Sequence, residues 1–330
     1  MRKHAAILTA AILALCTPAK AAGGVDSLFF DARGTFHQEI NNGTYGSRLQ
    51  ADYLNFHVFG HITDNVSFRI RQRLNTWIDE QNPFRATDWM CINWQATDRW
   101  AFSAGKTAIM IGGYEYDAPP IDVYFYSRFC NDIQQAFAFS VNATYTMRDG
   151  QDFTFQISNS PLTPGFSDTY AFNFAWLGHF APWWKTIWSY NLVEDSIHRK
   201  INYIALGNHW TFGNVALDLD LMDRASLSQR NLFSDYTLIT KLIWNTGKWN
   251  WCAKAGYESN AAENVDADGR PYDVIIAPGT RYLYGGVGIE YFPLGDKRIR
   301  LHATAFRDNY AKVSNFQMGV TWRFDLIRRK

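Results

Sequence analysis

Three arginines occupy alternate positions in the segment 68–74, which reads FRIRQRL. Successive side chains of an extended strand point to opposite faces, so Arg69, Arg71 and Arg73 would share one face. Guanidinium groups at this spacing form a row of permanent positive charge, and arginine suits bidentate contacts with phosphate or carboxylate. The segment therefore predicts a face that attracts anions. We call these three residues the arginine row.

Further basic candidates occur later in the chain. Arg298, Arg300 and His302 repeat the alternation, and Lys254 adds a base on another segment. A second interpretation stays open, in which these bases pair with acids and give a mixed lining. Bases and acids lie on different segments, so the sequence does not decide between the two. The acids concerned are Asp218, Asp220, Glu258 and Glu290.

A long interval, residues 109–131, separates two extended segments and is acidic and aromatic. A loop of this length is usually functional, and this one is too aromatic to move freely in water. We expect it to fold inward and to constrict an enclosed space. The alternative is a surface loop that packs over the opening. The side chains expected at the constriction are Tyr114, Glu115, Tyr116, Asp117, Asp122, Tyr124 and Arg128.

Enzyme signatures are weak. Gly105-Lys106-Thr107 resembles the end of a phosphate-binding loop, but Trp100 stands where the first glycine belongs. The sequence contains neither H-E-x-x-H nor G-x-S-x-G. Its eight histidines are scattered over many segments, so only a chance triad is conceivable. We predict no catalytic residue, no metal site and no cofactor, and we regard the protein as not an enzyme.

The first residues have the layout of a secretory signal. Arg2 and Lys3 precede the apolar stretch 5–16, and Ala19-Lys20-Ala21 offers small residues for cleavage. A lipid anchor on Cys16 is disfavoured because Leu15 stands where a small residue is needed. We therefore expect a cleaved signal at residues 1–22 and one domain over residues 23–330. Cys91, Cys130 and Cys252 follow the signal, an odd number without metal-ligand spacing.

The composition is aromatic and poor in charge. Of 330 residues, 16% are aromatic and 19% are charged, against about 25% charged in ordinary soluble domains. The hydrophobic content of 47% excludes a disordered chain, and the net charge of +1 argues against a nucleic-acid partner. After residue 22, the longest uncharged stretch, 169–184, is interrupted by polar residues and Pro182, so it does not suit a membrane helix.

A period of two residues runs from Ser27 to the C-terminus. It is clear in 134–147, 153–158, 215–221 and 315–324, and it is blurred in 184–192 and 202–210. Short turns separate about 16 such segments. The segments begin near residues 27, 46, 64, 86, 98, 132, 152, 169, 184, 198, 213, 232, 248, 281, 297 and 314.

Two all-β architectures fit this pattern: a soluble sandwich or propeller, and a transmembrane barrel. Tryptophan and tyrosine near segment ends favour the barrel, because barrels carry aromatic girdles at both membrane interfaces. We therefore predict a closed antiparallel transmembrane β-barrel of about 16 strands with an inserted constriction loop. An arginine on the lipid face would cost roughly 2–4 kcal/mol at the bilayer midplane, so the arginine row must face the lumen.

Several motifs resemble one family. Ala104-Gly105-Lys106, the run 112–117 (GGYEYD) and the run 120–124 (PIDVY) look like the Bacteroidetes-type porins of the phosphate-selective porin O and P family. The runs 53–55, 71–75 and 300–303 are also similar, and the resemblance extends over about 30–324. It implies a 16-stranded outer-membrane barrel, typically trimeric, whose third loop enters the lumen. Here that loop is acidic and aromatic rather than lysine-rich, which favours small solutes or anions in general over phosphate alone.

The sequence thus predicts a passive porin in the outer membrane of a Gram-negative bacterium. The expected partners are outer-membrane lipid, small hydrophilic or anionic solutes, two further copies of the chain in a homotrimer, and the barrel-assembly machinery. A structural or adhesive barrel with a closed lumen is the alternative, and a surface hydrolase barrel comes third.

Overall fold

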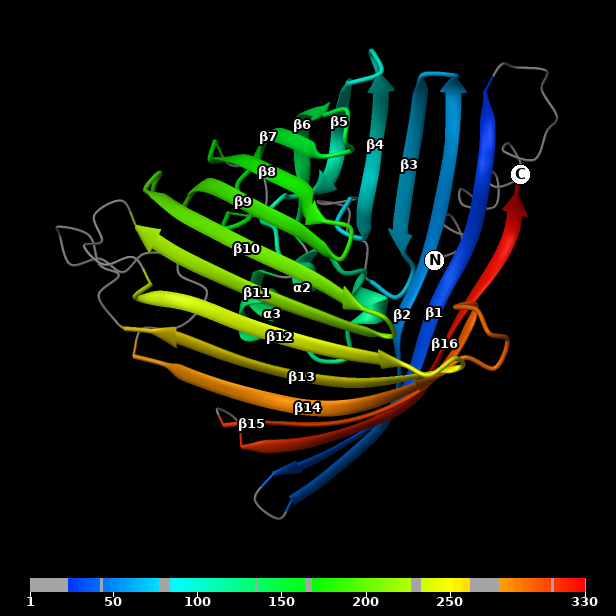
Figure 1. The fold of residues 1–330 in the computed structure, drawn as a ribbon, viewed down its shortest axis with the longest axis vertical. Coiled ribbons are helices and arrows are strands. Elements are labelled where there is room, and N and C mark those ends of the chain that lie inside the picture. Colours follow the sequence, from blue (N-terminus) through cyan, green and yellow to red (C-terminus); the bar gives the residue numbers. More distant parts are fainter. Residues whose placement is uncertain are drawn as a thin grey trace.

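Sixteen strands form one closed antiparallel sheet (Figure 1). The computed structural model describes residues 23–41, 44–76, 84–133, 136–163, 168–226, 233–261, 279–309 and 312–329, and the predicted signal at residues 1–22 lies outside them. Each strand pairs with its neighbours in sequence, and β1 (Gly24–Asn41) pairs with β16 (Val313–Arg328) to close the ring. The predicted closed barrel of about 16 strands is confirmed.

The strands begin close to the residues that the period of two indicated. One difference stands out: the segment expected near residue 132 begins at Phe137, because Arg128–Ile133 forms the short helix α3 instead. The remaining strands are β2 (Thr44–Thr63), β3 (Val66–Arg73), β4 (Thr87–Gln95), β5 (Trp100–Ala108), β6 (Phe137–Thr146), β7 (Asp152–Asn159), β8 (Tyr170–Ala181), β9 (Trp184–Glu194), β10 (Lys200–Phe212), β11 (Val215–Ser226), β12 (Asp235–Asn245), β13 (Trp249–Asn260), β14 (Arg281–Tyr291) and β15 (Ile299–Asp308).

The alternation sorts apolar and polar side chains to opposite faces of the wall. On β6, Phe139 and Val141 are exposed, whereas Ser140 and Asn142 are buried. In a soluble core the apolar side chains would be the buried ones. Apolar outside and polar inside is the arrangement of a barrel whose outer face meets lipid.

The two ends of the barrel differ. At one end the strands are joined by short turns, such as 64–65 and 213–214. Exposed tryptophans gather near this end, and their amphipathic rings suit the membrane interface. Outer-membrane barrels keep their short turns in the periplasm, and on that rule we expect this end to be the periplasmic one. These tryptophans are Trp94, Trp100, Trp183, Trp244, Trp249, Trp251 and Trp322.

All the helices in the described residues are too short or too polar to cross a membrane.

Candidate functional site

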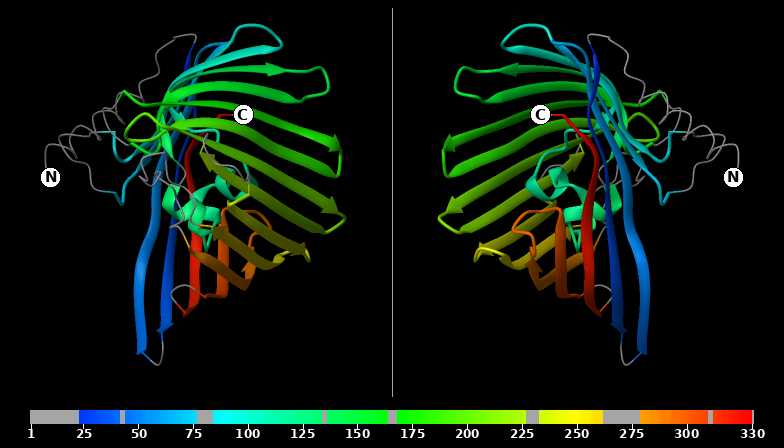
Figure 2. Two further views of the ribbon diagram at one scale, coloured as in Figure 1. Left: turned by 90° about the vertical axis from the view of Figure 1, so that its left-hand side faces the viewer. Right: turned by 90° about the vertical axis from the view of Figure 1, so that its right-hand side faces the viewer.

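The long connection between β5 and β6 lies within the ring of strands (Figures 1 and 2). We call its residues 109–133 the crossing segment. It contains α2 (Tyr114–Asp117), the 3-10 turn η1 (Pro120–Asp122) and α3 (Arg128–Ile133). Its contacts reach strands far apart around the barrel.

Apolar side chains hold the crossing segment against one part of the wall. Ile109, Ile111, Tyr116 and Phe129 pack into one buried cluster with inward-facing residues of β8 to β11. These wall residues are apolar although they face the lumen, and this blurs the period of two around 202–210, where Tyr203 and Ala205 face inward. Burying such a cluster stabilises the segment in place. The wall residues are Ala171, Val193, Ile201, Tyr203, Ala205 and Met222.

Two wall carboxylates bind backbone N–H groups of the crossing segment. Asp220 on β11 accepts from the N–H groups of Tyr114 and Glu115, each at 2.8 Å. Glu258 on β13 accepts from Arg128 at 2.5 Å and from Phe129 at 2.9 Å. The first N–H groups of a helix have no partner within the helix, so these acids satisfy them.

Two wall arginines bind the middle of the crossing segment. Arg33 on β1 donates to the carbonyl oxygens of Ile121 and Val123 at 3.1 and 3.0 Å. Arg300 on β15 donates to the carbonyl oxygen of Ile121 at 3.0 Å and pairs with Asp122 at 2.7 Å. The segment is thus attached to both β11–β13 and β15–β1.

Tyr124 adds a further contact near Arg300. Its hydroxyl donates to Glu290 on β14 at 2.7 Å, and its ring stacks on His302 with centroids 4.4 Å apart. Burial raises the pKa of the Tyr124 phenol well above its ordinary value. The phenol therefore stays protonated and remains a hydrogen-bond donor at neutral pH.

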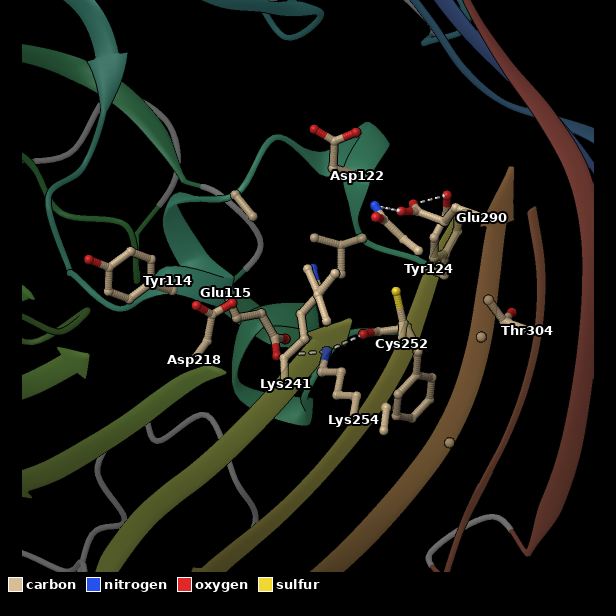
Figure 3. A pocket seen from close by; sticks show the side chains of 18 of the residues that line it. Tyr114, Glu115, Asp122, Tyr124, Asp218, Lys241, Cys252, Lys254, Glu290 and Thr304 are labelled. Carbon is tan, nitrogen blue, oxygen red and sulfur yellow. Dashed lines mark hydrogen bonds and ion pairs between the residues drawn. The ribbon is translucent and has the colours of Figure 1, made fainter. Parts of the chain in front are cut away.

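A cavity of about 470 Å³ lies between the crossing segment and the wall from β9 to β15 (Figure 3). The crossing segment contributes mostly acids and aromatics, and the wall contributes most of the bases. Among the predicted site residues, the lining contains Tyr114, Glu115, Asp117, Asp122, Tyr124, Lys254 and Arg300.

The strand register aligns five ionisable residues at one level of this wall. Each is the cross-strand partner of the next, and we call the set the cross-strand band. Asp218 binds His209 at 2.6 Å, and Lys254 pairs with Glu115 at 2.7 Å. The band consists of Lys185 on β9, His209 on β10, Asp218 on β11, Lys241 on β12 and Lys254 on β13.

Lys185 and Lys241 differ from the other bases of the cavity. Within the described residues, neither ammonium group has a hydrogen-bond or ion-pair partner. The sequence analysis did not single them out. Each lysine is a base on the inward face of its strand, which alternation could have indicated, but their common level follows only from the strand register.

The arginine row lies outside this cavity lining. Arg71 and Arg73 both pair with Asp88 on β4, at 2.8 and 3.0 Å, and Arg71 is buried. The Arg69 guanidinium lies 3.9 Å from the centroid of the Trp89 ring. The three bases do share one face of β3, but two of them are held by one acid on the neighbouring strand.

The other predicted residues are distributed as follows. Arg298 precedes β15 and pairs with Asp296 at 2.8 Å, so it does not extend a row with Arg300. His302 is buried beneath Tyr124. Tyr116 lies in the apolar cluster, and the Arg128 side chain is exposed. None of these four lines the cavity.

No group of three potential metal ligands occurs in the part of the chain that the structure describes.

Residues 24–183 match the model of the family described as phosphate-selective porin O and P. No protein of curated function matches the chain in sequence.

Solved structures share the fold. The anion-selective porin of Comamonas acidovorans is 9% identical, with a TM-score of 0.62 over 92% of this chain and 100% of that one. Pseudomonas putida OprB is 9% identical, with a TM-score of 0.62 over 92% and 94%. The trimer form of OmpT, an outer membrane protein of Vibrio cholerae, is 12% identical, with a TM-score of 0.58 over 92% and 100%.

Part of the chain, residues 24–183, thus matches a porin family, and the whole barrel shares its fold with solved outer-membrane porins.

Proposed function

We propose that small hydrophilic solutes diffuse passively through the cavity between the crossing segment and the β9–β15 wall, and that the crossing segment narrows this route. The observation that carries the proposal is the cavity itself, because charged side chains from both sides line it. On the arginine-row side, by contrast, Arg71, Asp88 and Cys91 are buried. That burial supports a route on the opposite side.

The charges of the route support a modest preference for anions. Most of its acids are engaged: Asp218 with His209, Asp122 and Glu290 with Arg300, and Asp220 with backbone N–H groups. Lys185 and Lys241 are without such partners in the described residues. Free ammonium groups in a pore raise the local anion concentration. The wall lysines, rather than the arginine row, would then set the charge preference.

Single-channel recording in planar bilayers tests both the passive diffusion and the preference for anions. Wild-type protein should give steady conductance steps, and their absence would favour a structural barrel with a closed lumen. In a salt gradient, the double variant Lys185→Gln/Lys241→Gln should lower the anion-to-cation permeability ratio. We expect a decrease of roughly two- to fivefold, because a potential change of about one kT alters the local ion concentration about threefold.

Lys248→Gln is the matched control. Lys248 lies in the periplasmic turn between β12 and β13 and donates to the carbonyl oxygen of Pro293. It does not line the cavity. An unchanged ratio in the double variant, or an equal decrease in the control, would refute the role of the two lysines.

We further propose that the barrel assembles as a homotrimer after cleavage of residues 1–22 and insertion by the barrel-assembly machinery. The trimer form of the similar Vibrio cholerae protein supports the assembly. The motifs at 104–106, 112–117 and 120–124 support a Bacteroidetes-type member of the family. The mass of the detergent-solubilised complex, measured by light scattering, would test the trimer.

A further inference from the structure

Two acids of the wall are almost completely buried. Asp220 is 1% exposed and Glu258 is 0% exposed. No ion pair of either carboxylate with lysine or arginine occurs in the described residues. Each instead accepts two consecutive backbone N–H groups of the crossing segment. A buried carboxylate without a cationic partner, whose oxygens accept backbone N–H groups, acts mainly to hold that backbone in position.

The two anchors have the same construction. Asp220 binds the first turn of α2, and Glu258 binds the first turn of α3. Hydrogen bonds to an ionised acceptor are roughly twice as strong as those between neutral groups, and the low polarity of buried surroundings strengthens them further. Thr237 of β12 donates to Glu258 at 3.1 Å and so orients this acid.

The anchors enclose the part of the crossing segment that forms one side of the cavity. Asp117 at the end of α2 lines the cavity, as do Asp122 and Tyr124 between α2 and α3. Two anchors on β11 and β13 fix both the distance and the rotation of this stretch relative to the wall. Glu115, which pairs with Lys254, also accepts the N–H of Ser127 at 2.6 Å and so ties the two helices together.

We propose that Asp220 and Glu258 are positioning residues that set the width of the solute route. They act by holding the crossing segment at a fixed distance from the wall, and not through the effect of their charge on solutes. This inference rests on the proposed function, in which the crossing segment narrows the route. It predicts that loosening the anchors widens the route for uncharged solutes as well as for ions.

Neutral sugars separate width from charge. The variant Asp220→Asn/Glu258→Gln keeps the side-chain shapes but replaces one acceptor oxygen of each anchor with an N–H donor. Each lost hydrogen bond to a charged group should lower the docking equilibrium constant by about tenfold or more. In liposome swelling, entry of a trisaccharide relative to a monosaccharide should therefore rise several-fold. A loss of luminal charge alone would leave this ratio unchanged.

A second pair of variants tests the anchor without touching the wall. Arg128→Pro removes the N–H that Glu258 accepts, and proline is well tolerated at the first position of a helix. Arg128→Ala removes the same side chain but keeps the N–H. Only the proline variant should raise the relative entry of the trisaccharide. Equal behaviour of the two variants would contradict the anchor.

Wild-type behaviour distinguishes the two proposals. If wild-type protein admits no sugar and gives no conductance, the proposed function fails. If wild-type protein conducts and neither the wall variant nor Arg128→Pro changes the sugar ratio, only the positioning role fails. Heat-dependent migration on a detergent gel establishes that each barrel is folded. Should the wall variant not fold, Arg128→Pro still decides, because it leaves every barrel strand unchanged.

Discussion

At the scale of single residues, a base on the inner face is either held by a partner within the protein or free to attract solutes. Arg71 and Arg73 share Asp88, whereas Lys241 has no such partner in the described part of the barrel. Alternation showed that the arginines share a face, but it could not show Asp88 opposite them. Strand register decides which side chains meet, and register depends on turn geometry and on the whole pattern of pairing.

Arg71→Gln should therefore affect stability more than selectivity. The substitution leaves Asp88, which is 2% exposed, with Arg73 as its remaining ion-pair partner. Removing one partner of a buried pair strongly destabilises a protein, and we expect a loss of about 3 kcal/mol because Arg73 remains. Urea unfolding in lipid vesicles, followed by tryptophan fluorescence, measures this loss.

The double variant Arg71→Gln/Asp88→Asn provides the control. It removes both members of the pair, so its loss should be smaller than the sum of the two single losses. The permeability ratio of Arg71→Gln should stay near the wild-type value. A lowered ratio with unchanged stability would show instead that Arg71 is a charge of the solute route.

At the scale of elements, the strands were predictable and the attachment of the long connection was not. The alternation places most strand starts within a few residues, because the lipid face and the lumen impose opposite polarity. Where Val193, Ile201 and Tyr203 receive the crossing segment, the inward face is apolar and the alternation is lost. The contacts of Asp220 and Glu258 join residues more than 100 positions apart. No local pattern encodes such pairings.

Two native cysteines report on the two sides of the crossing segment. Cys252 lines the cavity, whereas Cys91 is buried and is the cross-strand partner of Arg69. With Cys130→Ser in both backgrounds, Cys91→Ser leaves Cys252, and Cys252→Ser leaves Cys91. A small anionic methanethiosulfonate should label Cys252 in the folded barrel and lower the conductance. Cys91 should react only after unfolding. Rapid labelling of Cys91 in the folded barrel would place the route on the arginine-row side.

At the scale of the whole molecule, the positions of the exposed aromatic side chains indicate how the barrel is oriented in the membrane. The exposed tryptophans lie near the short-turn end, while Tyr170 and Tyr190, also exposed, lie nearer the other end. Composition and spacing predicted aromatic girdles, but not that tryptophan would favour one of them. Successive strands run in opposite directions, so the strand order must be known before a residue can be assigned to one end of the barrel. The preference of tryptophan for one end is therefore visible only in the structure.

The orientation can be tested on intact cells. An epitope inserted at Gly247, in the turn between β12 and β13, should be periplasmic. An epitope inserted at Ser196, between β9 and β10, should face the outside, because successive connections of an up-and-down barrel alternate between its two ends. Antibody should therefore bind only the Ser196 insertion until the outer membrane is permeabilised. Heat-dependent gel migration should be equal for the two, which excludes a folding defect. Antibody binding to the Gly247 insertion on intact cells would show that the barrel has the opposite orientation. Solutes from outside would then approach the cross-strand band from the other side.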